Sequence, residues 1–110
     1  MKIAFVVQRC GQNIFAGAEV LVLQLGTKLS EIFDIEVLTT TAKDASNWKN
    51  FYSEGTEKIG KLTIRRFLVD KERNPEFVPM SIYLETHNDD EQKGLDFINA
   101  NGPISTKLIN

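Results

Sequence analysis

The stretch KIAFVVQRCGQNIFAGAEVLVLQLGTKLSEIF, residues 2–33, decides the fold. It begins with a continuous β-prone apolar run, residues 3–7, which is typical of a strand covered on both faces by helices. A loop containing Gly11 and Gly17 follows, and an amphipathic helix starts near Ala18. This order predicts an α/β protein in which residues 3–7 form a central strand of a parallel sheet.

The helix is expected to pack on the sheet through one apolar stripe. Apolar residues recur there at helical spacing, namely Leu21, Leu25, Leu29 and Ile32, with Ala18 and Val22 beside them. Gly26 lies within the same helix, where glycine costs roughly 0.5–1 kcal/mol relative to alanine. Either a close contact between helix and strand requires Gly26, or Gly26 is a weak point. The sequence favours the weak point by a small margin.

A second β-rich run, residues 35–40, predicts the next strand and completes a right-handed β-α-β unit. The loop that follows, residues 41–56, holds more aromatic residues than a connection needs. We expect Trp48 and Tyr52 to cover a sheet edge or a helix end. Contact with a ligand is the alternative for these two side chains.

The next segment predicts a hairpin at the far side of the sheet. A short ribbon at residues 58–59 leads through a turn at Gly60 into a strand over residues 62–69. Alternation along this strand places Leu62, Ile64 and Arg66 on one face.

The last third of the chain reads as three helices. Residues 70–79 are charged and contain two prolines, which predicts an excursion from the sheet before a short helix over residues 80–85. Asn88 or Asp89 is expected to cap a further helix that runs to about residue 99 and stops at Gly102-Pro103. Ser105 then caps a final helical stretch over residues 106–109.

The length and amino-acid composition of the chain narrow the class of protein to which it can belong. The 110 residues suffice for one small domain, and we expect residues 1–110 to form a single, partial one. The chain lacks a run of about 20 apolar residues for a membrane span, and no signal-peptide cleavage pattern follows its apolar start.

A formal net charge of −2 argues against bulk attraction to nucleic acid, so Lys61, Arg65 and Arg66 are interpreted as a solvated strand face. The single cysteine, Cys10, leaves no internal disulfide and no metal cluster, and it favours a cytoplasmic location.

The start of the first helix is the first candidate for a binding site. The leading N–H groups of a helix have no partner within the helix, and the peptide dipoles place partial positive charge there. Glycine at position 17 lets a ligand approach the backbone closely. A phosphate is the anion that these features favour.

Several segments together resemble a known family. They are residues 1–9 (MKIAFVVQR), 16–19 (AGAE) and 36–40 (EVLTT), supported by 48–50 (WKN), 64–67 (IRRF) and 102–105 (GPIS). In this order they resemble the start of the group 1 glycosyltransferases of the GT-B fold, the family 4 retaining enzymes. The resemblance implies an incomplete Rossmann-like parallel sheet with flanking helices, from the N-terminal, acceptor-side domain. It also implies transfer of a sugar from a nucleotide-sugar donor to a lipid or polysaccharide acceptor across a cleft between two domains.

The resemblance also implies which residues form the site. In the intact enzyme, the donor diphosphate would be bordered by Ala16, Gly17, Ala18 and Glu19. The acceptor would be faced by Gln12, Asn13, Ile14 and Phe15. Glu19 is open to a second interpretation, as a carboxylate that merely complements the helix dipole. The family usually carries glycine where Ala16 stands, which would matter if that residue needed a positive φ.

The groups expected to perform the reaction lie outside these residues. The carboxylate pair that grips the donor belongs to the family's C-terminal domain, and its active-site histidine follows later strands. His87 matches no family position and is interpreted as a surface residue. We therefore assign no catalytic residue, metal or cofactor beyond the nucleotide-sugar substrate, and we expect the isolated chain to be inactive.

Three further hypotheses remain open. The chain could be a free-standing Rossmann-like binding module without catalysis, which a reading frame continuing into a second Rossmann-like half would argue against. With about three main strands, the first strand could also lack an outer neighbour, so we expect a homo-oligomer that seals this edge. Peripheral contact with a membrane is a further alternative for the intact enzyme.

Overall fold

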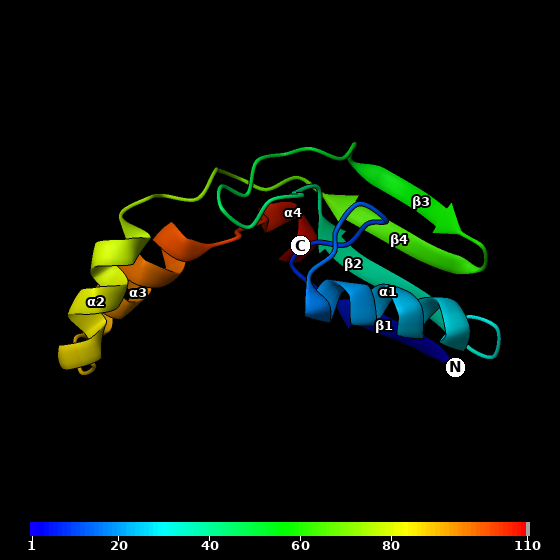
Figure 1. Ribbon diagram of the computed structural model, residues 1–110, viewed down its shortest axis with the longest axis horizontal. Coiled ribbons are helices and arrows are strands. Elements are labelled where there is room, and N and C mark those ends of the chain that lie inside the picture. The colour runs from blue at the N-terminus through cyan, green and yellow to red at the C-terminus, as the bar shows by residue number, and fades with distance from the viewer. Residues whose placement is uncertain (110) are drawn as a thin grey trace.

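The protein is a mixed α/β structure built on one four-stranded sheet (Figure 1). The computed structural model describes residues 1–109. The strand order is β1-β2-β4-β3, with β1 parallel to β2, β2 parallel to β4 and β3 antiparallel to β4. The strands are β1 (Lys2–Val6), β2 (Asp34–Thr40), β3 (Gly55–Ile59) and β4 (Leu62–Phe67). A mostly parallel sheet with flanking helices is compatible with a Rossmann-like α/β fold, so the predicted class is confirmed at this level.

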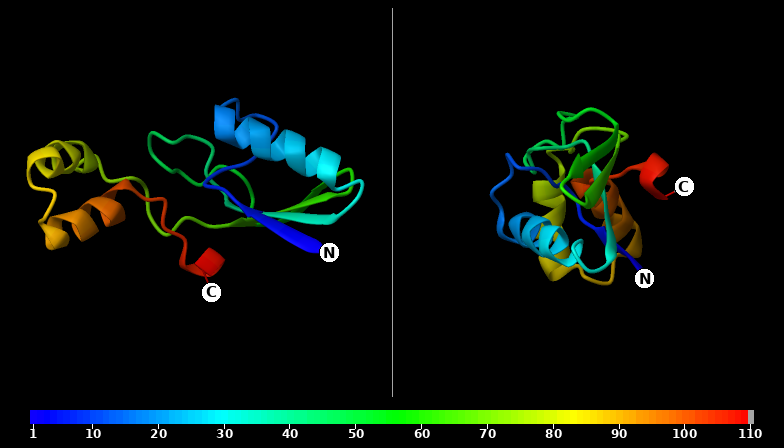
Figure 2. Two further views of the ribbon diagram at one scale, coloured as in Figure 1. Left: turned by 90° about the horizontal axis from the view of Figure 1, so that it is seen from below. Right: turned by 90° about the vertical axis from the view of Figure 1, so that its right-hand side faces the viewer.

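Helices lie on both faces of the sheet. Helix α1 (Gly17–Leu29) connects β1 to β2 in a right-handed crossover and covers one face, while α4 (Thr106–Ile109) lies on the other side (Figures 1 and 2). The core lies between α1 and the sheet, and its buried members are Cys10, Ile35, Val37, Leu62 and Ile64. The prediction that Leu62, Ile64 and Arg66 share one face is confirmed, since all three are buried on this side.

The apolar run predicted a central first strand, and within residues 1–109 this prediction is wrong; the alternative, a first strand without an outer neighbour, is confirmed. In the part of the chain that the structure describes, β1 pairs only with β2 and forms one edge of the sheet. Its residues alternate between exposed and half-buried, and Val6 is 67% exposed. The apolar run is not buried on both faces because α1 covers only one of them. An uninterrupted apolar run therefore did not distinguish an edge strand from a central one.

The predicted packing stripe of α1 is also largely wrong. Leu21, Leu25 and Ile32 are 55%, 44% and 76% exposed. Leu29 and Val22 pack against the core as predicted, together with Leu23 and with Phe33, which follows α1. Leucine occurs on both sides of this helix, so helical spacing alone offered two overlapping stripes.

Gly26 marks the closest approach of α1 to the sheet. It is buried, and a Cβ at this position would lie 3.1 Å from Cδ1 of Leu62 on β4. A side chain here would push against a packed leucine, so the close contact requires glycine. The interpretation of Gly26 as a weak point is therefore wrong.

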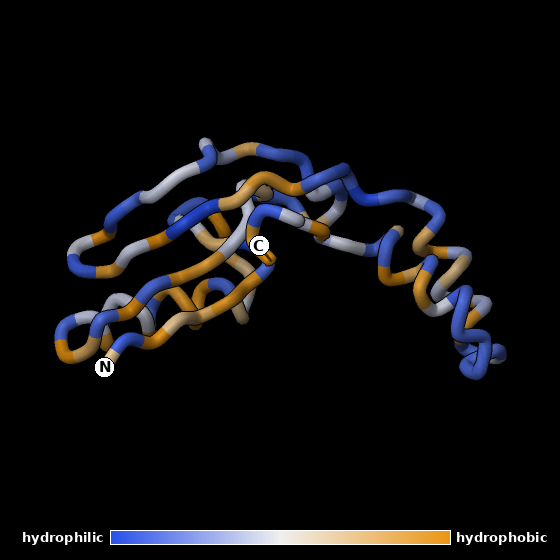
Figure 3. Tube along the Cα trace, turned by 180° about the vertical axis from the view of Figure 1, so that it is seen from behind, coloured by the Kyte–Doolittle hydropathy of each residue, from blue (hydrophilic) through white to orange (hydrophobic). Residues whose placement is uncertain are grey.

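Helices α2 (Phe77–Thr86) and α3 (Glu91–Asn101) form a hairpin that projects from the sheet (Figures 1 and 2). This projection makes the molecule elongated, with a longest extent of 47 Å. The turn between the two helices is strongly hydrophilic, whereas β1 is mainly apolar (Figure 3). No helix within residues 1–109 has the length and apolar character to cross a membrane.

The boundaries of these helices differ in part from the prediction. α2 begins at Phe77 rather than at residue 80, because Pro79 fits the first turn of a helix, where its missing N–H costs no bond. Asp90, and not Asn88 or Asp89, caps α3 by accepting a 3.0 Å hydrogen bond from the Lys93 amide. Gly102 ends α3 as predicted, with φ of 62°.

The predicted cap of the last helix is confirmed. The Ser105 Oγ accepts a 3.3 Å hydrogen bond from the Leu108 amide, which satisfies one free donor of α4. The same hydroxyl donates to the Leu68 carbonyl at 2.7 Å and so ties α4 to the end of β4.

Trp48 and Arg73 join the hairpin to the sheet. Trp48 is 3% exposed, and its indole Nε1 donates a 2.6 Å hydrogen bond to the Asn101 carbonyl at the end of α3. The Arg73 guanidinium lies 3.8 Å from the centre of the Phe77 ring and donates to the Ala45 carbonyl at 2.6 Å. It also donates to the side-chain oxygen of Asn101. The expectation that Trp48 covers a helix end is confirmed.

Candidate functional site

The predicted donor loop lies where β1 ends and α1 begins, at the carboxyl edge of the parallel strands. Ala16 is the N-cap residue, and Gly17 is the first residue of α1. The first helical hydrogen bond runs from the Val20 amide to the Ala16 carbonyl at 2.9 Å, so the amides of residues 17–19 have no acceptor within the helix. A Cβ at Gly17 would meet no atom within 4 Å. The backbone of the first turn therefore faces open space in which an anion would fit.

Ala16 needs no glycine-like backbone. Its φ of −85° and ψ of 148° lie in the extended region that any residue adopts. Its methyl group makes no cap hydrogen bond, and the helix start has no side-chain cap. The substitution of the family's usual glycine by Ala16 thus strains nothing in this loop.

Glu19 is engaged in an ion pair. Its carboxylate accepts a 3.0 Å bond from Arg9 Nε, and the two side chains are only 11% and 17% exposed. Arg9 also donates through Nη1 to the Lys43 carbonyl at 2.7 Å. The Arg9 cation offsets the negative charge of Glu19, which would otherwise repel a phosphate at the helix start.

Arg9 is a site residue that the sequence interpretation missed. It connects three segments that meet at the carboxyl edge of the sheet, namely the loop after β1, the first turn of α1 and the loop after β2. Its position as the first charged residue after β1 was the signal that could have identified it. The identity of its partners, 10 and 34 residues away, was not readable from the sequence.

The four predicted acceptor-facing residues do not share one environment. Gln12 and Asn13 are exposed, and Phe15 is 86% exposed. Ile14 is 5% exposed and packs inward, and its amide donates to the Gly11 carbonyl at 3.1 Å. A ligand above this loop would therefore meet Gln12, Asn13 and Phe15 but not Ile14.

Arg66 and Tyr52 anchor the loop from below. Arg66 is 5% exposed, donates through Nη2 to the Cys10 carbonyl at 2.9 Å and pairs with the Glu57 carboxylate. Its guanidinium lies 4.2 Å from the centre of the Tyr52 ring. A Cβ at Gly11 would lie 2.7 Å from Tyr52 Cζ and closer still to the hydroxyl oxygen. The loop therefore requires glycine at position 11 for close packing against Tyr52.

The three cations interpreted as a solvated strand face have different roles. Lys61 and Arg65 are exposed as expected and pair with Glu31 at 3.4 Å and Glu36 at 2.6 Å. For Arg66 the interpretation is wrong, because its side chain points to the α1 side of the sheet and is buried there. Alternate residues of a strand face opposite sides, which separates Arg65 from Arg66.

Burial sets the protonation of the two titratable groups under the loop. It raises the pKa of the Cys10 thiol and of the Tyr52 phenol, and the nearby Arg66 cation opposes this effect in both cases. Both groups are therefore neutral at neutral pH. Neither has the lowered pKa of an activated nucleophile.

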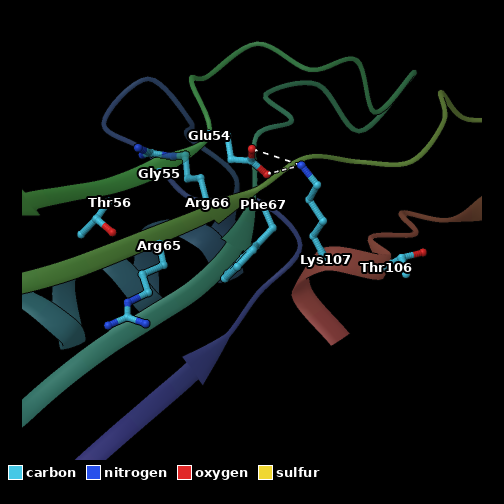
Figure 4. Close-up of a pocket in the computed structure, with 8 residues that line it drawn as sticks. All are labelled: Glu54, Gly55, Thr56, Arg65, Arg66, Phe67, Thr106 and Lys107. Carbon is cyan, nitrogen blue, oxygen red and sulfur yellow. Dashed lines mark hydrogen bonds and ion pairs between the residues drawn. The ribbon is translucent and has the colours of Figure 1, made fainter. Parts of the chain in front are cut away.

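A hollow of about 570 Å³ lies between the start of β3, the end of β4 and α4 (Figure 4). An ion pair of 3.3 Å between Lys107 and Glu54 crosses it, and the Arg66 side chain extends away from that pair. None of the predicted site residues lines this hollow. Among the described residues, Arg66 alone connects the two places, since it lines the hollow and also donates to the Cys10 carbonyl of the loop.

The remaining chemistry-bearing residues form no site. Within residues 1–109, no three His, Cys, Asp or Glu side chains gather so that they could hold a metal ion. His87, at the end of α2, is exposed and stacks on the Tyr83 ring with centroids 4.0 Å apart. This position agrees with its interpretation as a surface residue.

Comparisons with known proteins add no assignment. No protein-family model, no curated protein and no solved structure matches this chain. Proposals about its function therefore depend on the geometry of the loop and on the sequence resemblance.

Proposed function

We propose that this chain is the acceptor-side, N-terminal part of a nucleotide-sugar glycosyltransferase of the GT-B type. The observation that carries the proposal is the β1-loop-α1-β2 unit, in which Gly17 opens α1 at the carboxyl edge of two parallel strands with free space before it. Ligands of open α/β sheets bind at this edge, and helix starts bind phosphates. An anion site alone does not specify a reaction. The loop and both strands also resemble the glycosyltransferase family in sequence, in the same order along the chain, and this resemblance favours a sugar transferase.

The proposed roles follow from exposure and charge. The amides of Gly17 and Ala18 bind the donor diphosphate, because they carry unpaired N–H groups at the positive end of the α1 dipole. The Arg9–Glu19 pair holds the loop and removes the repulsion of a free carboxylate. Gln12, Asn13 and Phe15 contact the acceptor sugar or lipid. Because the donor-gripping carboxylates belong to a second domain in the family, the chain alone binds but does not transfer.

The competing function is a free-standing anion-binding module that uses the same amides. It shares the prediction of diphosphate binding at the start of α1. The two functions differ in the role of residues 12–15, because in an anion-binding module this loop would bind no acceptor molecule. The two functions therefore separate on ligands that resemble acceptors.

Titration of the ¹⁵N-labelled chain tests the proposal. Inorganic pyrophosphate and nucleoside diphosphates should shift the amide resonances of Gly17, Ala18 and Glu19, whereas short oligosaccharides and polyprenyl phosphates should shift those of Gln12 and Asn13. An anion module would respond to pyrophosphate only. Absence of any response at the start of α1 would refute both functions.

A pair of variants makes the titration specific. Gly17→Leu should abolish the response to pyrophosphate, because its Cβ meets no protein atom within 4 Å and the side chain would occupy the open space before the helix. Gly94→Leu is the matched control, since Gly94 is also helical and a Cβ there also meets no atom within 4 Å. Turnover of nucleotide sugars by the purified chain would contradict its role as a binding half.

A further inference from the structure

Arg66 carries a permanent positive charge into the interior of the protein. Its side chain is 5% exposed, and a guanidinium stays protonated in proteins. It pairs with the carboxylate of Glu57, whose side chain on the edge strand β3 is 48% exposed. The buried Nε of Arg66 has no hydrogen-bond partner within residues 1–109, and an unpaired buried N–H group costs free energy.

Stability alone does not account for an arginine at this position. Removing a charge from water costs free energy that a buried ion pair regains only in part, and apolar side chains of similar volume are often as stable or more stable in its place. A buried charged side chain can instead fix one arrangement of the groups that it bonds. The contacts of Arg66 show which arrangement this is.

The backbone after β1 is held by side chains of two other strands. The ladder between β1 and β2 ends with the Val7 amide, which donates to β2. Beyond it, Thr40 Oγ1 of β2 donates to the Gln8 carbonyl at 2.6 Å. Nη2 of Arg66, on β4, donates to the Cys10 carbonyl at 2.9 Å. These two bonds continue the attachment of the chain to the sheet after the ladder has ended.

The guanidinium of Arg66 is itself held from two sides. It lies 4.2 Å from the centre of the Tyr52 ring, and its Nη1 bonds Glu57. Tyr52 in turn packs against Gly11, where an added Cβ would lie 2.7 Å from Tyr52 Cζ. The planar fork of arginine reaches a carbonyl and a carboxylate in two fixed directions, which the single ammonium group of lysine does not reproduce.

Fixed points connect Cys10 to the start of α1. The Ile14 amide donates to the Gly11 carbonyl at 3.1 Å and closes a turn that contains residues 12–13. Ile14 is 5% exposed, so its side chain holds the end of this turn against the protein. Ala16 follows two residues later as the N-cap of α1. Displacement of Cys10 would therefore move both the exposed residues of the turn and the first amides of the helix.

We propose that Arg66 is a positioning residue for the anion site at the start of α1. By holding the Cys10 carbonyl, it sets the course of residues 11–16 and the direction of the free amides of Gly17 and Ala18. This inference rests on the proposed function, because that function assigns the donor diphosphate to these amides. Arg66 acts through the loop and does not contact the ligand itself.

Three variants separate positioning from charge. Arg66→Met should weaken the binding of pyrophosphate, measured by ¹⁵N titration, about tenfold or more, because the anion must then order the loop. Arg66→Lys keeps the charge but not the fork, and it should weaken binding to a similar degree. Lys61→Met removes a cation whose side chain is 67% exposed, and it should leave binding unchanged. Wild-type affinity in either variant of Arg66 would overturn the proposal.

Measurements without ligand test the positioning separately. In both variants of Arg66, the backbone order parameters of residues 11–16 should fall, whereas those of β2 and β4 should stay unchanged. Chemical denaturation of Arg66→Met should give a midpoint equal to or above that of the wild type, because an apolar side chain replaces a buried charge. Order that falls throughout the sheet, together with a lower midpoint, would assign Arg66 a merely structural role and overturn the proposal.

The outcomes distinguish this inference from the proposed function. A wild-type chain that does not bind pyrophosphate would refute the proposed function and, with it, the site that Arg66 is proposed to position. Pyrophosphate binding by the wild type, with an unchanged loop in both variants of Arg66, would refute the positioning role alone.

Discussion

The sheet with α1 and the α2–α3 hairpin are held in place by different forces. The sheet is fixed by side chains removed from water, with Ile35 and Val37 of β2 packed against Leu62 and Ile64 of β4. Among the described residues of the two hairpin helices, only Ala100 is buried. The hairpin is attached to the sheet mainly by two side chains. The Arg73 guanidinium contacts Ala45, Phe77 and Asn101, and the Trp48 indole donates to the Asn101 carbonyl.

The difference predicts different modes of opening. Buried apolar area stabilises at roughly 25 cal/mol per Å², and it is lost only when the sheet itself opens. A few hydrogen bonds and cation–π contacts are worth about 1 kcal/mol each and can break locally. The hairpin should therefore open independently of the sheet, as a separate and weaker unit.

Removal of a buried side chain from the sheet gives the largest expected effect. Ile64→Ala, at a fully buried position, should lower the free energy of unfolding by about 2–5 kcal/mol and the melting temperature of the whole molecule. Ile82→Ala is the matched control on α2, where the side chain is 62% exposed, and it should cost about 0.5 kcal/mol or less. Similar losses for the two variants would show that the hairpin is as well buried as the sheet.

Substitution of Arg73 tests the attachment of the hairpin. Arg73→Met keeps the apolar stem but removes the bonds to Ala45 and Asn101, and it should cost about 1–3 kcal/mol of local stability. Hydrogen exchange should become faster in α2 and α3 and stay unchanged in β2 and β4. Lys71→Met, at an exposed neighbour, should change neither. Equal acceleration in the strands would show that hairpin and sheet open together.

The two helix starts predict opposite changes. Ala16→Ser gives α1 the side-chain cap it lacks and should stabilise it by about 0.5–2 kcal/mol. Asp90→Ala removes the cap of α3 and should destabilise that helix by a similar amount. Chemical denaturation measures the first change and hydrogen exchange in α3 the second. A destabilising Ala16→Ser would show that the loop before α1 cannot supply a cap.

Acid should weaken the hairpin by a small amount. Two hydrogen bonds lower the pKa of Asp90 below its ordinary value of 3.8. The bond from the Lys93 amide has the larger effect and the bond from the Tyr83 hydroxyl the smaller. The ionised form is therefore favoured by folding, and its contribution is present above pH 3.8 and lost as the pH falls through the lower pKa of the folded state. Hydrogen exchange in α3 should accelerate over this range. Asp90→Asn keeps a cap but does not titrate, so it should remove this part of the acid response.

Local sequence patterns predicted most helices and strands. They predicted less well how these elements are placed relative to one another. The β-α-β unit, the turn at Gly60, the stop at Gly102 and the cap at Ser105 were all readable, because each depends on residues a few positions apart. The ribbon before Gly60 was expected only over residues 58–59, whereas β3 begins at Gly55. The edge position of β1 within residues 1–109 was indicated only by the small number of expected strands, whereas the apolar run itself favoured a central position. The packing side of α1 was ambiguous because leucines occupy both candidate stripes.

The candidate site was predictable in its backbone and not in its side-chain contacts. Gly17 and the start of α1 lie where the glycine loop indicated. The contacts of Arg9 with Glu19, and of Arg66 with the Cys10 carbonyl, join segments up to 56 residues apart. Such contacts depend on the register and twist of the sheet, which spacing along the chain does not encode.

Trp48 can report by its fluorescence on the contact between the α2–α3 hairpin and the sheet. It is the single tryptophan of the chain, and its indole is buried and bonded to the last residue of α3. Detachment of the hairpin would expose this indole to water and shift its emission to longer wavelength, while the sheet stays folded. The intrinsic fluorescence of the unlabelled protein therefore measures the position of the hairpin at concentrations too low for resonance methods.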